Sequence, residues 1–266
     1  MFPNVNPISL SDEQIAFYRK NGFIQIDHVL SDEELGELRQ CIEEAMGAED
    51  GRAVHTSQTD GVYYRVLNQK VNTWRDHAGM ANYVFHPRFA DLALQLTGAS
   101  GIRLFHDHAL WKMPGDSKPT PWHQDFPYWP MEAPGALSIW IALDDVDESN
   151  GCMMFVPKSH QAGKLQPISL SDPQNLFDYV QDEELASDKA VICRMKAGSC
   201  TFHHGQTFHY AHANATDRPR RVLAIIFTPD DIVYNGKTHV ITDHTYMKQG
   251  EPFHGGLFPL LAARRA

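Results

Sequence analysis

The sequence has few features of membrane, nucleic-acid-binding or repeat proteins. No stretch of its 266 residues approaches the roughly 18 consecutive apolar residues that a membrane helix needs. Its 23 Lys and Arg are outnumbered by 33 Asp and Glu, and the net charge of −10 argues against nucleic acid or an anionic membrane as a partner. The absence of internal repeats and low-complexity runs excludes a solenoid or a largely disordered chain.

Cysteine is also scarce. The chain has four cysteines, none of them in a C-x-x-C pair. The N-terminal residues lack the basic and apolar regions of a secretory signal peptide. Scattered cysteines without a secretion signal are typical of reduced, buried thiols, so we expect a cytoplasmic protein.

The remaining composition is that of an ordinary globular protein, with 42% hydrophobic and 21% charged residues. A chain of this length can form one large domain. We expect a single domain over residues 1–266, with a helical part over about 1–100, a strand-rich core over about 101–230 and a C-terminal extension over 231–266.

Helix signals dominate the first hundred residues. Ser11 and Ser31 each begin a capping box, and we expect a helix after each of them. Between these helices, residues 23–26 alternate like a short strand. Residues 51–70 are expected to form a loop that leads into a strand, and two further helices are expected near 73–85 and 87–97.

From residue 102 onward the chain has short β-prone segments separated by turns, which favours a sandwich or barrel. A polar insertion at 161–188, with a short helix after Ser171-Asp172-Pro173, interrupts the series. We therefore expect an α+β protein: a double-stranded β-helix (jelly-roll, cupin-like) core with N-terminal helices packed on it. The predicted strands are 102–113, 136–143, 152–156, 190–195, 199–204 and 221–227.

Histidine is unusually frequent, at 15 residues, and one of them begins the pattern His123-x-Asp125. In an extended backbone residues i and i+2 point to the same face, so this pair can take neighbouring positions on a metal ion. Iron(II) oxygenases use two histidines and one carboxylate in this way. Alone the pattern is weak, because a loop histidine beside an exposed acid is the simpler interpretation.

The segment at 202–214 offers candidates for a second histidine, since it contains four. Shortly after it, Arg220 and Arg221 open an apolar strand. A buried arginine needs an anionic partner, and its planar fork suits a carboxylate. Strand alternation places the two arginines on opposite faces, so one of them should point into the core cavity.

These features together resemble the phytanoyl-CoA dioxygenase (PhyH) family of Fe(II)- and 2-oxoglutarate-dependent oxygenases. The resemblance covers most of the chain, and the combination is specific although each motif alone is not. The motifs are the opening Ser-Asp-Glu-Gln and Asn-Gly-Phe, Lys112-x-Pro114-Gly115, Trp122-His123-Gln124-Asp125, Trp140-Ile141-Ala142-Leu143, Asn150-Gly151, Val156-Pro157-x-Ser159-His160, and a final His-x-Ala-x-x-Asn…Arg.

The resemblance implies that His123, Asp125 and His209 hold Fe(II). Of the four histidines in the second segment, His209 matches the family pattern because Asn214 follows five residues later and Arg220 eleven residues later. This makes His203, His204 and His212 less suitable as ligands.

The resemblance also implies a 2-oxoglutarate site. Arg220 matches the residue that pairs with the distal carboxylate of this cosubstrate. Lys70 and Trp140 match positions that contact it, and His108 falls where the family often has a methionine near it. His160 is expected to be structural.

The implied reaction uses O2 and 2-oxoglutarate, releases succinate and CO2, and oxidises a C–H bond of a small-molecule substrate. Asp125 favours hydroxylation over halogenation, because related halogenases lack this carboxylate. No basic cluster suits a CoA phosphate tail. The substrate and the oligomeric state stay open. Six residues have two possible roles: they either line the substrate pocket or pack at the mouth of the barrel. They are Tyr63, Tyr64, Arg65, Phe126, Tyr128 and Trp129.

Two other functions fit the same residues. The chain could be a non-catalytic jelly-roll protein that binds a metal or a small ligand, or a cupin-like enzyme that uses the metal without 2-oxoglutarate. Arg220 separates the cupin-like enzyme from the 2-oxoglutarate-dependent oxygenase, because only the latter needs a cation for the distal carboxylate of 2-oxoglutarate.

Overall fold

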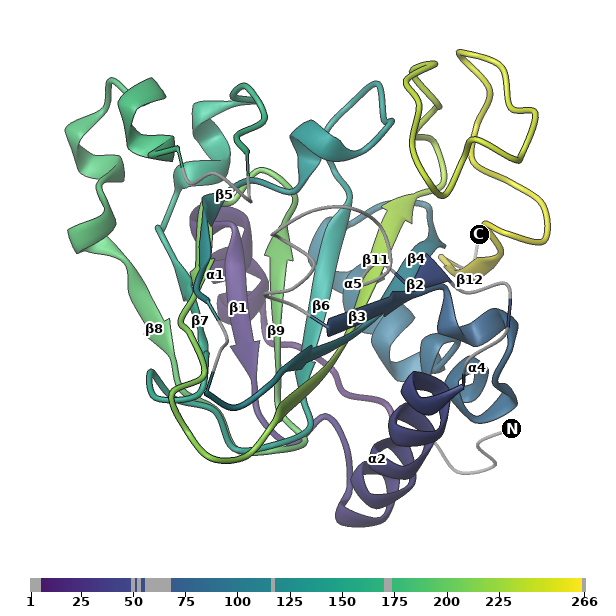
Figure 1. Cartoon of the computed structure of the whole chain (residues 1–266). Helices are drawn as coiled ribbons and strands as arrows, with labels where there is room; N and C mark the ends of the chain where they lie inside the picture. The colour runs from purple at the N-terminus through teal and green to yellow at the C-terminus, as the bar shows by residue number, and fades with distance from the viewer. Residues whose placement is uncertain are drawn as a thin grey trace.

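The fold is built on two antiparallel sheets that face each other (Figure 1). It is known from a computed structural model that describes residues 6–48, 51, 54–55, 68–115, 118–169 and 174–264. Within these residues the larger sheet has eight strands and the smaller has four. The predicted α+β double-stranded β-helix, with helices packed on it, is confirmed.

The strand order in each sheet places sequence-distant segments side by side. The larger sheet runs β1 (Phe23–Ile26), β9 (Cys200–His204), β6 (Leu137–Ala142), β11 (Arg220–Pro229), β4 (Gly101–Lys112), β3 (Asn68–Val71) and β2 (Val54–His55), with β12 (Leu260–Ala263) also paired to β4. The smaller sheet runs β5 (Thr120–His123), β10 (His209–Ala211), β7 (Met153–Phe155) and β8 (Val191–Cys193).

The helices form where the capping signals place them. Ser11 and Ser31 accept hydrogen bonds from the backbone N–H groups of Gln14 and Glu34, and both capping boxes are complete. The helices are α1 (Asp12–Asn21), α2 (Asp32–Gly47), α4 (Ala78–Val84) and α5 (Pro87–Thr97), and a 3-10 turn, η2 (Thr73–Arg75), precedes α4.

The main hydrophobic core lies between these helices and the outer face of the larger sheet (Figure 1). On β11, Leu223 and Ile225 point into this core, whereas Ala224 and Ile226 line the space between the sheets. Strand alternation thus separates the residues that hold the helices from those that line a cavity.

Four of the described strands were not predicted, namely β2, β5, β10 and β12. Each of them has only two to four residues, too few for a periodic pattern to show. The insertion forms 3-10 turns, η4 (Ser159–Ala162), η5 (Leu176–Tyr179), η6 (Glu183–Leu185) and η7 (Ser187–Lys189), in place of a helix. Its proposed cap at 171–173 lies outside the described residues. In the described part of the chain, no helix is long and apolar enough to cross a membrane.

Gly22 ends α1 at a point where the chain has no room for a side chain. Its φ of 81° lies in the left-handed region, and its backbone N–H donates to Tyr18 O at 2.7 Å. A Cβ at this position would lie 2.5 Å from His160 Nδ1 and 2.5 Å from Thr207 Oγ1. Both neighbours lie next to strands of the smaller sheet, since His160 follows β7 and Thr207 precedes β10.

We therefore predict that Gly22→Ala lowers the free energy of unfolding by at least about 1–2 kcal/mol, the cost of the left-handed backbone alone. Chemical denaturation followed by circular dichroism measures this. Gly36→Ala is the control, because Gly36 lies inside α2, where an added methyl group would have nothing within 4 Å. That variant should be about 0.5–1 kcal/mol more stable than the parent. Equal stability of the two variants would contradict the prediction.

Candidate metal and cosubstrate site

The cavity between the sheets contains the three residues of the predicted triad. His123 ends β5 and His209 begins β10, and the two are directly paired across the strands. One ligand atom from each of His123, Asp125 and His209 lies within 4.8 Å of the others. Two imidazoles and a carboxylate at this spacing can bind one metal ion.

Asp125 reaches this position by a different route from the one predicted. The expected geometry was an extended strand with residues i and i+2 on one face. In the structure β5 ends at His123, and Asp125 has φ −77° and ψ −43°, at the start of the 3-10 turn η3 (Phe126–Tyr128). The extended-strand premise is therefore wrong, and a turn brings the carboxylate toward the two imidazoles.

Both imidazoles are oriented by backbone carbonyls. His123 Nδ1 lies 2.7 Å from Pro121 O, and His209 Nδ1 lies 2.9 Å from Thr207 O. Because a carbonyl only accepts, each Nδ1 carries the hydrogen and each Nε2 keeps its lone pair. Burial lowers the pKa of His123, with a further contribution from His209, which favours the neutral form that binds metals.

The two oxygens of Asp125 have different surroundings. Oδ1 lies 3.6 Å from His123 Nε2 and 3.5 Å from His209 Nε2. Oδ2 lies 3.1 Å from Ser138 Oγ and 3.3 Å from His203 Nε2. Burial alone would raise the pKa of Asp125, but its contacts with the imidazoles of His209, His123 and His203 hold it well below its usual value.

Arg220 is the second feature of the cavity. It is 2% exposed, and its guanidinium lies over the Trp140 ring, with Cζ 5.2 Å from the ring centroid. Among the described residues, its Nε and Nη1 have no hydrogen-bond partner. Burial lowers the pKa of Arg220 to about 10, so it stays charged at neutral pH. A buried cation with unused donors fits a carboxylate ligand.

Arg221 faces the other way. Its Nη2 lies 2.6 Å from Asp144 Oδ1, and its Nη1 also pairs with Glu43. The prediction that one arginine of the pair points inward is confirmed, and Arg220 is that residue. Lys112, paired with Arg220 across the strands, donates to the carbonyls of Lys118, Ala211 and His212.

The structure does not bring Lys70 to the cavity, in contrast to the prediction that it contacts the cosubstrate. Its Nζ donates to Ala45 O at 3.0 Å and Ala48 O at 2.9 Å, at the C-terminal end of α2. An ammonium group at this end donates to helix carbonyls that lack partners within the helix, and it interacts favourably with the negative end of the helix dipole. The neighbouring residue Gln69 lines the cavity instead, because successive side chains on β3 point to opposite faces.

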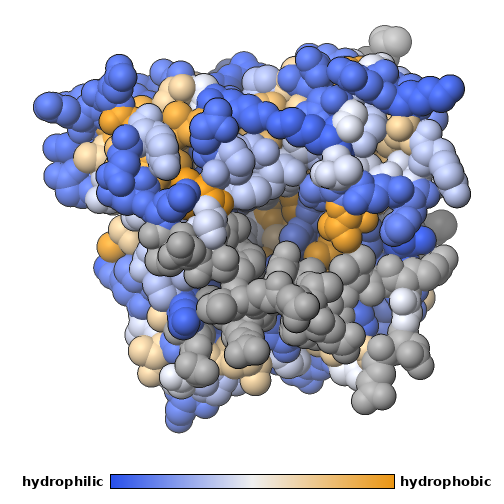
Figure 2. Space-filling view, turned by 45° about the horizontal axis from the view of Figure 1, so that its top comes forward, coloured by the Kyte–Doolittle hydropathy of each residue, from blue (hydrophilic) through white to orange (hydrophobic). Residues whose placement is uncertain are grey.

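Trp140 and His108 both line the cavity, and their contact with the cosubstrate stays a prediction. His108 Nδ1 lies 3.3 Å from Gln69 Oε1, and burial lowers the pKa of His108 to about 4. The cavity has a volume of about 140 Å³, whereas pockets for drug-sized ligands are about 300–1,000 Å³. It suits a small diacid. In the space-filling view, the face toward the viewer has a hollow with apolar surface in its depth (Figure 2).

The aromatic residues after Asp125 pack against other apolar groups. Phe126 and Trp129 are buried in a cluster with residues of the C-terminal segment, and Tyr128 Oη donates to Ile168 O at 2.7 Å. None of the three lines the triad cavity. This supports the packing interpretation. Tyr63, Tyr64 and Arg65 lie outside the described residues.

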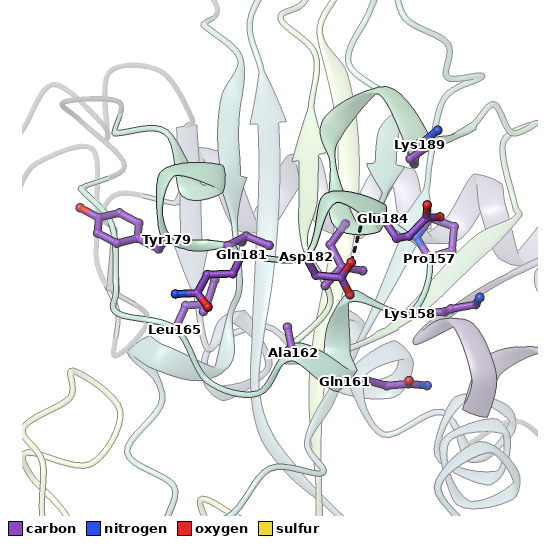
Figure 3. A pocket seen from close by; sticks show the side chains of 12 residues that line it. Pro157, Lys158, Gln161, Ala162, Leu165, Tyr179, Gln181, Asp182, Glu184 and Lys189 are labelled. Atoms are coloured by element: carbon purple, nitrogen blue, oxygen red, sulfur yellow. Dashed lines mark hydrogen bonds between the residues drawn. The ribbon is translucent and has the colours of Figure 1, made fainter.

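A larger groove of about 710 Å³ lies on the insertion, away from the triad. Lys158, Asp182 and Lys189 are among its lining residues (Figure 3). Figure 3 shows that its side chains point in different directions and do not converge on one point. The smaller cavity, with its convergent imidazoles and unpaired guanidinium, is the better candidate site.

The remaining histidines have other roles in the structure. His160 Nε2 lies 3.2 Å from Arg19 O, next to Gly22, in keeping with a structural role. His204 Nδ1 accepts a hydrogen bond from Gln206 N. His203 was predicted to be less suitable as a ligand than His209, and it contacts the Asp125 carboxylate without belonging to the ligand group. No local signal in the sequence marks this contact, because its partner is 78 residues away.

A family model described as Phytanoyl-CoA dioxygenase (PhyH) matches residues 18–222. The chain belongs to the PhyH family. It is accordingly a 2-oxoglutarate-dependent non-haem iron oxygenase by family, and the His-x-Asp…His cluster has the composition of the facial triad of that class.

Two sequence relatives illustrate the breadth of the PhyH family. Dioxygenase lolE1 of Epichloe uncinata is 33% identical over 225 residues, which are 80% of this chain and 81% of the relative. The peroxisomal phytanoyl-CoA dioxygenase of Bos taurus is 26% identical over 240 residues, which are 85% of this chain and 70% of the relative.

Two similar proteins of solved structure are named for reactions other than hydroxylation. SnoK, a non-heme alpha ketoglutarate dependent carbocyclase from nogalamycin biosynthesis, is 30% identical with a TM-score of 0.82, over 97% of this chain and 100% of its own. The epimerase SnoN, in complex with Fe3+, alpha ketoglutarate and nogalamycin RO, is 29% identical with a TM-score of 0.79, over 94% and 98%.

Lys70 and Gln69 lie on opposite faces of β3, and substitutions at the two positions can therefore test which one affects the cosubstrate. We predict that Lys70→Met lowers the free energy of unfolding by about 1–3 kcal/mol, because two carbonyls lose a charged donor. The same variant should leave the affinity for 2-oxoglutarate unchanged. Gln69→Ala, from the opposite face of β3, is the matched control and should change that affinity without a comparable loss of stability. Denaturation and anaerobic 2-oxoglutarate titration measure the two effects, and weakened cosubstrate binding by Lys70→Met would restore the original assignment.

Proposed function

We propose that the chain oxidises a C–H bond of a small-molecule substrate, with hydroxylation as the reaction, using Fe(II), 2-oxoglutarate and O2. The observation that carries this proposal is the buried Arg220 guanidinium, with two unused donors, in the same cavity as His123, Asp125 and His209. A metal-binding protein without the cosubstrate has no need of this costly buried charge.

In this proposal each residue has one task. His123, Asp125 and His209 would hold the iron, with the two Nε2 atoms and the Asp125 carboxylate as the available ligand atoms. Arg220 binds the distal carboxylate of 2-oxoglutarate, and the Trp140 ring fixes the guanidinium plane. When bound, iron and 2-oxoglutarate together supply the oxidant, with release of succinate and CO2. The apolar residues around them, Ala224 and Ile226 among them, keep water away from the reacting groups.

The substrate would approach from outside the 140 Å³ cavity, since that volume is suited to the cosubstrate. Oxidation without oxygen insertion is a second candidate, because the carbocyclase SnoK and the epimerase SnoN have similar folds at 29–30% identity. Once a substrate is found, turnover under ¹⁸O2 separates the two. Hydroxylation places the label in the product, whereas cyclisation or epimerisation does not.

We predict that anaerobic addition of Fe(II) and 2-oxoglutarate gives a visible charge-transfer band, and that admitting air then releases succinate. Asp125→Ala should abolish tight iron binding, the band and succinate release, because a ligand is lost. The control Asp188→Ala removes an exposed carboxylate of η7 and should retain all three. An intact parent protein that gives neither band nor succinate would refute the proposed function. Full activity of Asp125→Ala would refute the ligand assignment.

We also predict that Arg220→Leu weakens 2-oxoglutarate binding by about 30-fold or more, since losing one partner of a buried charge pair costs about 2–5 kcal/mol. Iron affinity should change little. Arg221→Leu is the control, because Arg221 pairs with Asp144 and Glu43 on the outer face. Anaerobic titration of the charge-transfer band gives both affinities. Oxidation that survives Arg220→Leu undiminished would favour a cupin-like enzyme that does not use 2-oxoglutarate.

A further inference from the structure

We propose that His203 is a positioning residue that, together with Ser138, restricts Asp125 to binding the metal through Oδ1 alone. This inference rests on the proposed function, because it concerns the same iron site. It assigns a role to a histidine outside the triad.

The contacts of the carboxylate carry the inference. Oδ1 faces the two imidazole Nε2 atoms, at 3.5 and 3.6 Å, and so faces the place where an ion would lie. Oδ2 faces Ser138 Oγ at 3.1 Å and His203 Nε2 at 3.3 Å. Two donors on one oxygen fix the plane of the carboxylate and occupy the lone pairs that a second metal bond would need.

The two donors come from the opposite sheet. His203 on β9 and Ser138 on β6 are direct cross-strand partners, so their side chains leave the same face of the larger sheet side by side. Both are buried, at 3% and 4% exposure. Asp125 follows β5 of the smaller sheet. The hydrogen bonds therefore join the two sheets at the metal site.

The protonation of His203 follows from its partner. A carboxylate only accepts, so Nε2 carries the hydrogen. Nδ1 is buried and has no hydrogen-bond partner among the described residues. Leaving a ring nitrogen unsatisfied is unfavourable, and a residue kept only for packing would avoid it with an apolar ring. The bond to Asp125 offsets that cost, which makes the Asp125 contact the reason for a histidine here.

The number of metal coordination positions gives the contact between His203 and Asp125 a function. A triad that contributes one atom per residue leaves three of the six octahedral positions open. If 2-oxoglutarate takes two of them through its keto and carboxylate oxygens, one would be left for O2. A carboxylate that bound through both oxygens would leave one position too few. His203 and Ser138 thus keep the third position available.

The test compares Fe(II) and Co(II) binding to the purified apoprotein, without turnover. We expect His203→Phe to weaken metal binding by about 10- to 100-fold, the usual effect of removing a hydrogen-bond partner of a ligand. His203→Gln, whose amide can still donate to Oδ2, should bind nearly as tightly as the parent. The Co(II) d–d spectrum of His203→Phe should change shape, because the freed carboxylate can bind through both oxygens.

Stability of the apoprotein separates positioning from packing. His203→Phe should melt close to the temperature of the parent, because loss of the hydrogen bond to Asp125 and removal of the unsatisfied Nδ1 oppose each other. If His203→Phe does not fold, His203→Leu replaces it in the same comparison, with Ser138→Ala as the second variant that removes a donor from Oδ2.

Two outcomes overturn the inference. One is parental metal affinity and an unchanged Co(II) spectrum in the apolar variants. The other is equal weakening by His203→Gln and His203→Phe, which would mean that ring shape and not the hydrogen bond matters. Both differ from failure of the proposed function, in which the parent protein itself would bind no Fe(II) and give no charge-transfer band.

Discussion

The Asp125 carboxylate is buried between two sheets, where burial alone would disfavour its charge. Three imidazoles and a serine hydroxyl surround it, and these contacts hold the charged form. Because His123 and His209 face one oxygen while Ser138 and His203 face the other, the carboxylate also fixes how the smaller sheet sits against the larger one. The ion site and the cosubstrate anchor at Arg220 can share one cavity only with the sheets in this arrangement.

Much of the architecture follows from local rules that the sequence displays. The capping boxes at Ser11 and Ser31 act within four residues, and the alternation of β11 sends Arg220 inward and Arg221 outward. Short strands could not be predicted in the same way. β5 and β10 are held by their partners across the sheet rather than by their own pattern, although they carry both histidines of the triad.

In the candidate site, too, some residues could be predicted from the sequence and others could not. The motif residues of the triad and Arg220 were predicted by resemblance, and the structure brings them together. Lys70 was placed at the cosubstrate, yet it lies one residue from the face that lines the cavity, and in a strand one residue reverses the side chain. His203 could not be predicted at all, because its contact with Asp125 depends on the pairing of β6 with β9 and on the turn after β5.

The arrangement of ligands on the two sheets has a thermodynamic consequence. The proposed metal ligands belong to the smaller sheet and the turn that follows β5, whereas the guanidinium for the diacid belongs to the larger sheet. A diacid that binds the metal at one end and Arg220 at the other would therefore span the two sheets, so a metal already in place would provide one of its two points of attachment. By linkage this effect is mutual. The distance between the two sheets would thus set how well one diacid can reach both the metal and the arginine.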